Sequence, residues 1–309
     1  MTTYSLAIHG GAGTILKSKM TDAQEAEYHA GLARALEAGE AVLRQGGTAM
    51  DAVTAAVCQL EDEPLFNAGR GAVFTTEGQQ EMDACIMDGR DRATGAVAGI
   101  FGPKNPIRAA RAVMETTSHV CLIGPNALEI ARAAGLDFCD PDYFFTQSRW
   151  DALQQTLEMR ARGEESDDPA RRHGTVGAVA RDRDGNLAAA TSTGGMTAKL
   201  PGRVGDTPMP GAGTFADNAT CAVSGTGHGE VFIKYTAGAE IAARMRHAGQ
   251  SLAEAADHVV MRDLGAHDGS GGVIAVDGDG TLVLPFNCEG MYRAHVREGS
   301  DPVTAIYRD

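Results

Sequence analysis

Residues 171–229 read RRHGTVGAVARDRDGNLAAATSTGGMTAKLPGRVGDTPMPGAGTFADNATCAVSGTGHG, and this stretch organises the rest of the chain. The segment that leads into it, GEESDDPARRH at residues 163–173, is charged and contains a proline. Such a composition is typical of an exposed linker. The linker stops at Gly174, and Thr175 then opens the apolar run of residues 176–179. A functional boundary is therefore expected between Gly174 and Thr175.

Thr175 is a candidate nucleophile, created by cutting the chain between Gly174 and Thr175. A threonine hydroxyl is a poor nucleophile unless a base lies beside it, and an amine freed on the same residue is such a base. An α-amino group titrates at about 7.7–8.0, so a useful fraction of it is neutral near pH 7. The alternative is that Thr175 simply begins a β-strand, where threonine is common.

Composition limits the class of protein. The chain has 309 residues, of which 43% are hydrophobic and 22% charged, as in a folded globular protein. A formal net charge of −14 argues against nucleic acid or an anionic membrane as a partner, because both would be repelled. An anionic substrate would need a local cation, and Arg203 in a Gly/Pro-rich loop is a candidate. The alternative is a solvated loop arginine.

Cysteines and apolar runs indicate the compartment. The six cysteines include no CxxC pair, so no zinc ribbon or redox motif is indicated, and we expect most to be buried thiols of a reducing compartment. The first residues, 1–13, lack the basic region of a signal peptide. No apolar run reaches the about 18 residues expected of a membrane helix. The sequence therefore predicts a cytoplasmic protein.

Hydrophobic spacing predicts an α+β protein whose two halves share one layered, sheet-rich domain. We expect a strand at residues 4–8 that runs into a glycine-rich turn, HGGAG at residues 9–13, and DRDG at residues 182–185 marks a hairpin. The other expected strands are residues 81–87, 93–101, 119–123, 175–181, 186–192, 221–224, 272–276, 281–285 and 291–296. The expected helices are residues 22–44, a second helix capped by Thr48, then 106–116, 126–134, 147–160, a helix from GTGHGE to about 247, and 251–264.

Three further features bear on chemistry. Asn67 lies in the loop of residues 60–75 between two apolar residues, an unusual place for an amide unless its hydrogen bonds are used; a turn role is the alternative. Thr193, in TSTGG, is expected on the strand beside Thr175, where it could hydrogen-bond the hydroxyl or the amine of that residue. GTGHG, residues 225–229, offers N–H groups and the Thr226 hydroxyl at a helix N-terminus, which suits an oxyanion hole.

These features lie within six motifs that closely resemble the plant-type L-asparaginase and isoaspartyl (β-aspartyl) peptidase family of N-terminal nucleophile hydrolases. The motifs run nearly end to end in the order of that family. They are IHGGAG (8–13), LFNAGRGAV (65–73), HGTVGAVA (173–180), GNLAAATSTGGMTAKLPGRVGDTP (185–208), GTGHGE (225–230) and FNCEGMYRA (286–294). The linker and residues 138–155 match less distinctly.

The resemblance implies a four-layer αββα fold and a precursor that cuts itself between Gly174 and Thr175. Residues 1–174 would form an α subunit, with residues 163–174 as its exposed linker. Residues 175–309 would form a β subunit that stays within the same αββα domain. Two such αβ units would normally pair into an α2β2 assembly.

The resemblance also implies a catalytic role for several motif positions. Thr175 would be the nucleophile and Thr193 its supporting hydroxyl. Thr226 and the N–H group of Gly227 would form the oxyanion hole. Asn67 would reach the same site from the α subunit.

Substrate and ion binding follow from the same resemblance. Arg203 would bind the α-carboxylate of the substrate, and Asp206 with the carbonyls of Gly227 and Gly229 would bind its α-ammonium group. This pattern of charges suits a zwitterionic aspartyl group. No organic cofactor is implied, but a structural sodium ion is, bound by main-chain carbonyls of Leu60, Glu61, Glu63, Phe66, Ala68 and Arg70.

The expected activity is hydrolysis of β-aspartyl dipeptides and L-asparagine to L-aspartate through an acyl-enzyme on Thr175. Glycosylasparaginase, disfavoured by the missing signal peptide, and a threonine endopeptidase, disfavoured by a clamp suited to small substrates, are alternatives in the same superfamily. A nucleotide- or sugar-binding protein that uses HGGAG and GTGHG as anion loops is the alternative of a different class. The sequence does not decide between L-asparagine and β-aspartyl dipeptides, because one pocket for the aspartyl group would serve both.

Overall fold

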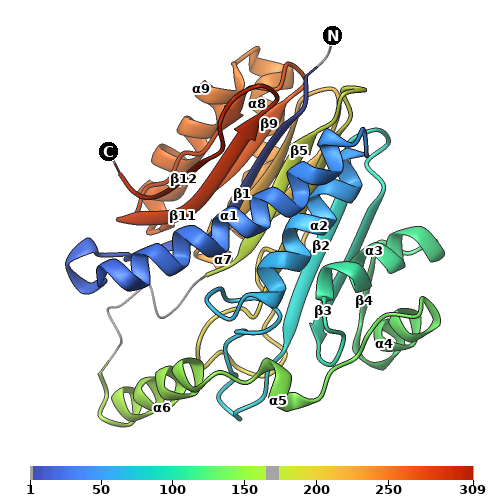
Figure 1. Cartoon of the computed structure of the whole chain (residues 1–309). Helices are drawn as coiled ribbons and strands as arrows, with labels where there is room; N and C mark the ends of the chain where they lie inside the picture. The colour runs from blue at the N-terminus through green and yellow to red at the C-terminus, as the bar shows by residue number, and fades with distance from the viewer. Residues whose placement is uncertain (1–2, 165–173, 309) are drawn as a thin grey trace.

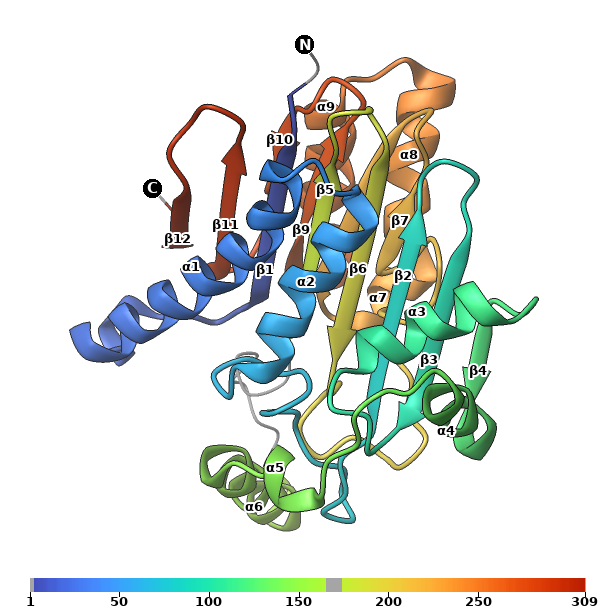
Figure 2. The ribbon, with the colours of Figure 1, turned by 45° about the vertical axis from the view of Figure 1, so that its right-hand side comes forward.

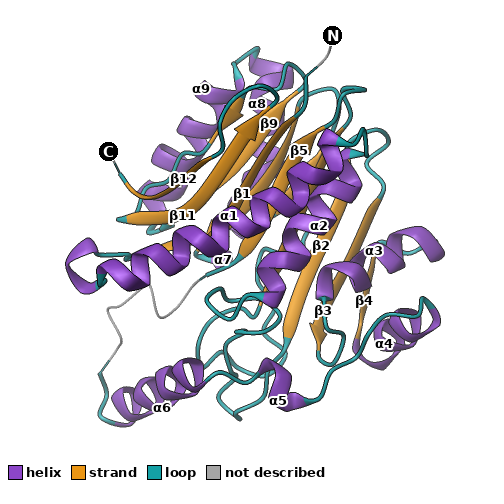
Figure 3. Ribbon diagram, in the orientation of Figure 1, coloured by secondary structure: helices purple, strands orange, loops and turns teal. Residues whose placement is uncertain are grey.

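Two β-sheets lie face to face in the middle of the protein, and helices cover the outer face of each (Figures 1 and 3). The structure is a computed structural model that describes residues 3–164 and 174–308. Most of the expected linker, residues 165–173, lies outside the described residues. The expected four-layer αββα fold of the α+β class is confirmed.

The larger sheet contains the boundary at Thr175. Among the described residues it has eight strands in the order β12-β11-β1-β5-β6-β2-β3-β4, and β3 with β4 is its parallel pair. The strands are β1 (Ser5–Gly13), β2 (Met82–Asp88), β3 (Thr94–Ile100), β4 (Cys121–Ile123), β5 (Val176–Arg181), β6 (Leu187–Thr193), β11 (Gly290–Arg297) and β12 (Val303–Tyr307). Strand β5 therefore begins one residue after Thr175 and lies in the middle of the sheet.

The smaller sheet has the order β10-β9-β8-β7 and packs on the inner face of the larger one. Its strands are β7 (Thr214–Ala216), β8 (Cys221–Gly227), β9 (Gly271–Asp277) and β10 (Leu282–Val283). Strands β8 and β9 contact β1 and β5, and β7 contacts β6 and β2. The smaller sheet therefore packs directly against β5, the strand that begins after Thr175.

Helices form the two outer layers, and a further pair lies at one end of the larger sheet (Figure 2). Helices α1 (Asp22–Arg44), α2 (Ala49–Asp62), α3 (Pro106–Thr116) and α4 (Gly124–Ala133) cover the larger sheet. The smaller sheet is covered by α7 (Gly229–Tyr235), α8 (Ala237–Ala248) and α9 (Leu252–Asp257), which continues as a π-helix (His258–Leu264). Helices α5 (Pro141–Phe144) and α6 (Gln147–Ala161) lie at the end, and short 3₁₀ turns occupy Lys17–Lys19 and Gly265–His267.

Alternation of side chains along the strands produces two cores. Successive residues of a strand point to opposite faces of the sheet. Leu6 and Ile8 of β1 accordingly pack under the outer helices, whereas Ala7 packs in the core shared with the smaller sheet. On the inner face of β5, Gly177 leaves no room for a side chain, because a Cβ atom built there would lie 2.0 Å from Oγ of Ser224. Small residues therefore let the two sheets approach closely beside Thr175.

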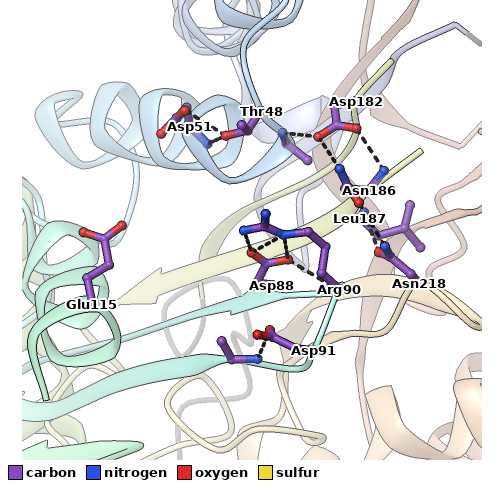
Figure 4. A network of polar contacts seen from close by, with 12 residues as sticks. Thr48, Asp51, Asp88, Arg90, Asp91, Glu115, Asp182, Asn186, Leu187 and Asn218 are labelled. Carbon is purple, nitrogen blue, oxygen red and sulfur yellow. Dashed lines mark hydrogen bonds and ion pairs between the residues drawn. The ribbon is translucent and has the colours of Figure 1, made fainter. Parts of the chain in front are cut away.

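Polar contacts join the predicted hairpin to its neighbours (Figure 4). The carboxylate of Asp182 accepts hydrogen bonds from the N–H of Asn186 at 2.9 Å and from the N–H of Ala49, in the first turn of α2, at 3.1 Å. Asn218, in the turn between β7 and β8, accepts from the N–H of Leu187 at 2.8 Å. The far end of the β5–β6 hairpin is thus tied to a helix and to the smaller sheet.

Several sequence predictions about local structure are wrong. HGGAG is not a turn but the second half of β1, which pairs with β11 through an irregularity between His9 and Gly11. Its glycines permit close backbone approach rather than chain reversal. The helix expected up to residue 247 is interrupted at Thr236, which has a φ of +43°. Strands β7 and β12 were not expected, because they are short and lack clear alternation.

Gly95 of β3 provides a test of the packing between α3 and the larger sheet. A Cβ atom built there would lie 2.0 Å from the carbonyl oxygen of Ala110, a backbone atom of α3. We expect Gly95→Ala to lower the free energy of unfolding by about 1–3 kcal/mol, as overpacking does. Denaturant unfolding measures this. Gly278→Ala, whose added Cβ would meet its nearest neighbour at 3.9 Å, is the control; equal stability of the two variants would contradict the packing.

Candidate active site

The hydroxyl of Thr175 is buried and is bonded to a second hydroxyl. Its Oγ1 donates to Oγ1 of Thr193 at 3.2 Å, and the N–H of Gly195 donates to the same Thr193 oxygen at 2.9 Å. The register of β5 with β6 pairs Val176 with Ser192, so Thr175 and Thr193 come next along the two strands. The structure therefore brings together the two threonines that the sequence singled out.

The junction between Gly174 and Thr175 is enclosed by residues of the first half of the chain. A Cβ atom built on Gly11 would lie 2.8 Å from Cα of Gly174, and one built on Gly174 would lie 3.1 Å from Cβ of Asn67. The amide of Asn67 donates to the carbonyl of Gly195 at 2.7 Å and accepts from the N–H of Val73 at 3.0 Å. The hydrogen bonds of Asn67 are therefore used, and they fix this residue beside the junction.

His9 connects the junction to the smaller sheet, and sequence reasoning did not single it out. Its Nδ1 lies 2.9 Å from the carbonyl oxygen of Thr175, and its Nε2 lies 2.8 Å from Oγ of Ser224. Burial lowers the pKa of His9 to about 3, so the ring is neutral. Because a carbonyl only accepts, Nδ1 carries the hydrogen and Nε2 accepts from Ser224. Ser224 continues the chain of hydroxyls to Thr191 at 2.8 Å.

The predicted oxyanion-hole residues lie at the end of β8. The N–H of Ala12 donates to Oγ1 of Thr226 at 3.2 Å, and Ala12 adjoins the Gly11 that faces the junction. Residues 225–227 belong to the strand, and helix α7 starts at Gly229, so the predicted turn at a helix N-terminus is shorter than expected. Neither Thr226 nor Gly227 forms a hydrogen bond with Thr175 in the described chain.

The predicted clamp for the aspartyl group is formed by two neighbouring loops. Gly229 lies between its charged groups: a Cβ atom built there would be 2.8 Å from Oδ1 of Asp206 and 3.0 Å from Nη2 of Arg203. Arg203 donates from Nε and Nη2 to the two carboxylate oxygens of Glu230, each at 2.9 Å. Sequence reasoning missed Glu230. Its carboxylate binds the guanidinium of Arg203 in the way that a substrate carboxylate would.

Asp206 is buried, and one of its oxygens has no hydrogen-bond partner in the described chain. Burial raises the pKa of its carboxyl group to about 7, although the nearby charge of Arg203 acts in the opposite direction. An ammonium group placed beside this carboxylate would lower that pKa again and satisfy the free oxygen. The geometry therefore suits Asp206 to an amine ligand.

Two further buried charges lie next to the clamp and were not expected. Lys199 donates from Nζ to the carbonyl of Glu81 at 2.7 Å, and a Cβ atom built on Gly195 would be 3.0 Å from this Nζ. Asp83 pairs with Thr193 across β2 and β6, and its Oδ2 has no partner in the described chain. Desolvation raises the pKa of Asp83 and lowers that of Lys199. The position of Lys199 inside the motif STGGMTAK was the signal that could have identified it.

The carbonyl groups expected to hold a sodium ion belong to the last turn of α2, which contains Leu60 and Glu61, and to the loop that follows it next to Asn67. The carbonyl of Glu61 accepts from the N–H of Arg70 at 2.7 Å, which closes the loop. A Cβ atom built on Gly71 would lie 2.6 Å from the carbonyl oxygen of Phe66. Hard cations prefer oxygen ligands, so an all-carbonyl set fits such an ion. In the described residues no cluster of three His, Cys, Asp or Glu side chains could hold a metal.

The burial of the cysteines and the character of the helices can be compared with what the composition predicts. Cys58, Cys85, Cys221 and Cys288 are buried, Cys139 is partly buried and Cys121 is exposed, and all six are free thiols. Within residues 3–164 and 174–308, no helix combines the length and the apolar character that a bilayer crossing requires. The prediction that most cysteines are buried is therefore confirmed.

The fold and the site together agree with the N-terminal nucleophile hydrolases that the sequence motifs resemble. A threonine directly precedes a central strand of an αββα sandwich, a second hydroxyl supports it, and glycine-rich segments of both sheets surround it.

Comparison with known proteins places the chain in a family. A family model described as asparaginase matches residues 2–306, and the chain belongs to this asparaginase family. The chain is 51% identical to an isoaspartyl peptidase of Salmonella typhimurium, with all of both chains covered. It is 52% identical to an isoaspartyl peptidase of Escherichia coli, over 98% of this chain and 96% of that one. A human isoaspartyl peptidase/L-asparaginase is 41% identical over 95% and 93%.

The buried, neutral His9 predicts a contribution to acid sensitivity. The pKa of His9 is about 3 in the folded protein against an ordinary value of 6.5, so the unfolded chain binds a proton that the folded protein does not. The free energy of unfolding should therefore fall as pH drops from 6.5 towards 3. We expect His9→Gln to show a shallower loss than the wild type, measured as melting temperature between pH 7 and 4.5. The exposed His247→Gln is the control, and parallel profiles for His9→Gln and the wild type would contradict this reasoning.

Proposed function

We propose that the protein cuts itself between Gly174 and Thr175 and then hydrolyses β-aspartyl dipeptides and L-asparagine to L-aspartate. The observation that carries the proposal is the hydrogen bond between the hydroxyls of Thr175 and Thr193, next to a clamp that contains Arg203 and Asp206. The names of the relatives, isoaspartyl peptidase and isoaspartyl peptidase/L-asparaginase, support this choice of substrates.

Maturation uses the hydroxyl of Thr175 against its own backbone. Oγ1 attacks the carbonyl carbon of Gly174, the bond from that carbon to the nitrogen of Thr175 breaks, and an ester joins the two residues. The nitrogen takes the hydroxyl proton and becomes a free amine. Water then hydrolyses the ester, which leaves a carboxylate on Gly174. The close contact of Gly11 and Asn67 with the junction supports this step, because it limits the conformations of the attacked carbonyl.

Turnover uses the same hydroxyl with the new amine as its base. The amine takes the proton from Oγ1 of Thr175, and Oγ1 attacks the side-chain carbonyl of the aspartyl group. The proton passes to the leaving nitrogen, so ammonia or an amino acid departs and a β-aspartyl ester stays on Thr175. Water cleaves this ester, which releases aspartate and restores the hydroxyl. Thr193 keeps Oγ1 oriented throughout, and His9 stays neutral because of its low pKa.

The negative charge that develops on the attacked carbonyl needs preorganised donors. We assign this role to the hydroxyl of Thr226 and the N–H of Gly227. Ala12 donates to Thr226, which orients that hydroxyl. Asn67 supports the site from the other half of the chain through its bond to Gly195.

The clamp selects the aspartyl group by charge. The substrate carboxylate replaces Glu230 on Arg203, which presents two parallel donors. The ammonium group binds Asp206 and the carbonyls of Gly227 and Gly229. Burial of Asp206 makes an unpaired negative charge there costly, so a cationic ligand is favoured.

A sodium ion bound by the expected carbonyls of residues 60–70, at the end of α2 and in the loop after it, would stabilise the segment that carries Asn67. No organic cofactor is needed for the steps above. The division into an α subunit (residues 1–174) and a β subunit (residues 175–309), the pairing of two αβ units and the cytoplasmic location stay predictions. Small molecules are the substrates.

The alternatives are less well supported. HGGAG continues strand β1 along β11 and does not form a loop that leads into a helix N-terminus, so it lacks the usual form of an anion loop in a nucleotide- or sugar-binding protein. A glycosylasparaginase or a threonine endopeptidase would have to place a larger substrate at the clamp. The names of the relatives favour neither of these activities.

Replacement of Thr175 tests both acts of the proposal. We expect Thr175→Ala to stay one uncut chain on a denaturing gel and to lose activity by about 10⁴-fold or more, because no other hydroxyl can form the acyl-enzyme. Thr175→Ser, which keeps a hydroxyl and an amine, should still be cut and should keep measurable activity. A cut or active Thr175→Ala protein is the result that excludes Thr175 as the nucleophile.

A further inference from the structure

A cavity that neither Arg203 nor Asp206 lines borders the junction at Gly174. It has a volume of about 150 Å³, and its walls include Gly11, Asn67, Gly174, Tyr28, Tyr292 and Arg149. Cavities that bind drug-sized ligands measure about 300–1,000 Å³, so this one has the size of a smaller group such as one amino acid. Arg149 comes from α6, at the end of the larger sheet (Figure 2).

Asn67 separates this cavity from the clamp. One side of Asn67 lines the cavity, and its amide nitrogen donates to the carbonyl of Gly195. A Cβ atom built on Gly195 would be 3.4 Å from Nη1 of Arg203, so Gly195 borders the clamp. Neither Arg203 nor Asp206 lines the cavity. A substrate whose aspartyl end binds the clamp would have to extend past Asn67 to reach this cavity.

Arg149 gives the cavity a positive charge. Its Nε donates to the carbonyl of Gly71 at 2.9 Å and its Nη2 to the carbonyl of Leu65 at 3.3 Å, which fixes the guanidinium in the wall. No carboxylate in the described residues forms an ion pair with Arg149. Desolvation lowers its pKa below the ordinary value. A partly buried cation without an acidic partner is stabilised when an anion binds beside it.

The rings of Tyr28 and Tyr292 supply an aromatic wall of the same cavity. They stack with their centroids 4.2 Å apart, and Phe66 packs against both. The cavity therefore combines one fixed guanidinium with aromatic surface. An amino acid with a free carboxylate and an apolar side chain presents the complementary groups.

We propose that this cavity is the subsite for the leaving group, in which Arg149 binds the α-carboxylate of the amino acid released from a β-aspartyl dipeptide. The inference rests on the proposed function and adds to it the chemistry of the leaving side. L-Asparagine releases only ammonia and gains nothing from Arg149. A dipeptide with a neutral C-terminal amide keeps its side chain in the cavity but loses the bond to the guanidinium.

Three substrates isolate the contribution of the C-terminal carboxylate to hydrolysis. They are β-aspartyl-leucine, its C-terminal amide β-aspartyl-leucinamide, and L-asparagine. For the matured wild-type enzyme we expect kcat/KM to be about tenfold to a hundredfold higher for the acid than for the amide, the range of a hydrogen bond to a charged group. In Arg149→Met this ratio should fall to about one, and in Arg149→Lys it should lie between the two.

The ratio of kcat/KM for the acid to kcat/KM for the amide does not change if the loop that Arg149 contacts is disturbed. Arg149 also binds two loop carbonyls, so its loss can lower all three activities by a common factor, which cancels between acid and amide. Arg160→Met is the matched control, because Arg160 lies on the same helix and donates to the carbonyl of Ala198 at 2.8 Å but does not line the cavity. It should keep the wild-type ratio.

Each outcome decides one claim. A wild-type enzyme that hydrolyses acid and amide equally well overturns the subsite, and this measurement needs no variant, so it decides even where Arg149→Met does not fold. An unchanged ratio in Arg149→Met also overturns it. A wild-type enzyme that hydrolyses none of the three substrates contradicts the proposed function instead, which keeps the two failures distinct.

Discussion

The position of β5 between β1 and β6 is the constraint on which the site depends. Hydrogen bonding on both edges fixes the register, so the residue just before Val176 must stand opposite Thr193. The same pairing places His9 of β1 against the carbonyl of Thr175. Gly177 then allows β8 to come close enough for Ser224 to reach His9. A backbone ladder therefore positions the nucleophile, and side chains only refine its orientation.

The distribution of charge explains how an acidic protein can accept an anionic substrate. The net charge of −14 would repel carboxylates at long range. Dissolved salt screens this repulsion, so that it is weak beyond about 10 Å from the protein surface. Close to Thr175 the structure buries or half-buries three cations: Lys199 and Arg203 in one loop, and Arg149 on helix α6. Their partners are mainly carbonyl groups and one exchangeable carboxylate, Glu230. Local cations thus determine what binds.

Much of the fold could be predicted from the sequence, because long amphipathic helices and the DRDG hairpin have strong local signals. HGGAG was misread because glycines signal a turn locally, whereas here they serve close approach between strands. Thr175, Thr193 and Asn67 were found through motifs and do lie together. His9, Glu230, Lys199 and Arg149 were missed because their role depends on contacts with residues far away in the sequence. Periodicity and composition carry no information about such contacts.

The central claim is that one hydroxyl performs both the cut and the turnover. The most direct measurement is mass spectrometry of the purified protein after an acid quench during hydrolysis of β-aspartyl-leucine. The account predicts two chains, residues 1–174 and 175–309, and an added aspartyl group on the N-terminal peptide of the second chain. An aspartyl group on any other residue, or turnover by the intact chain, would contradict it.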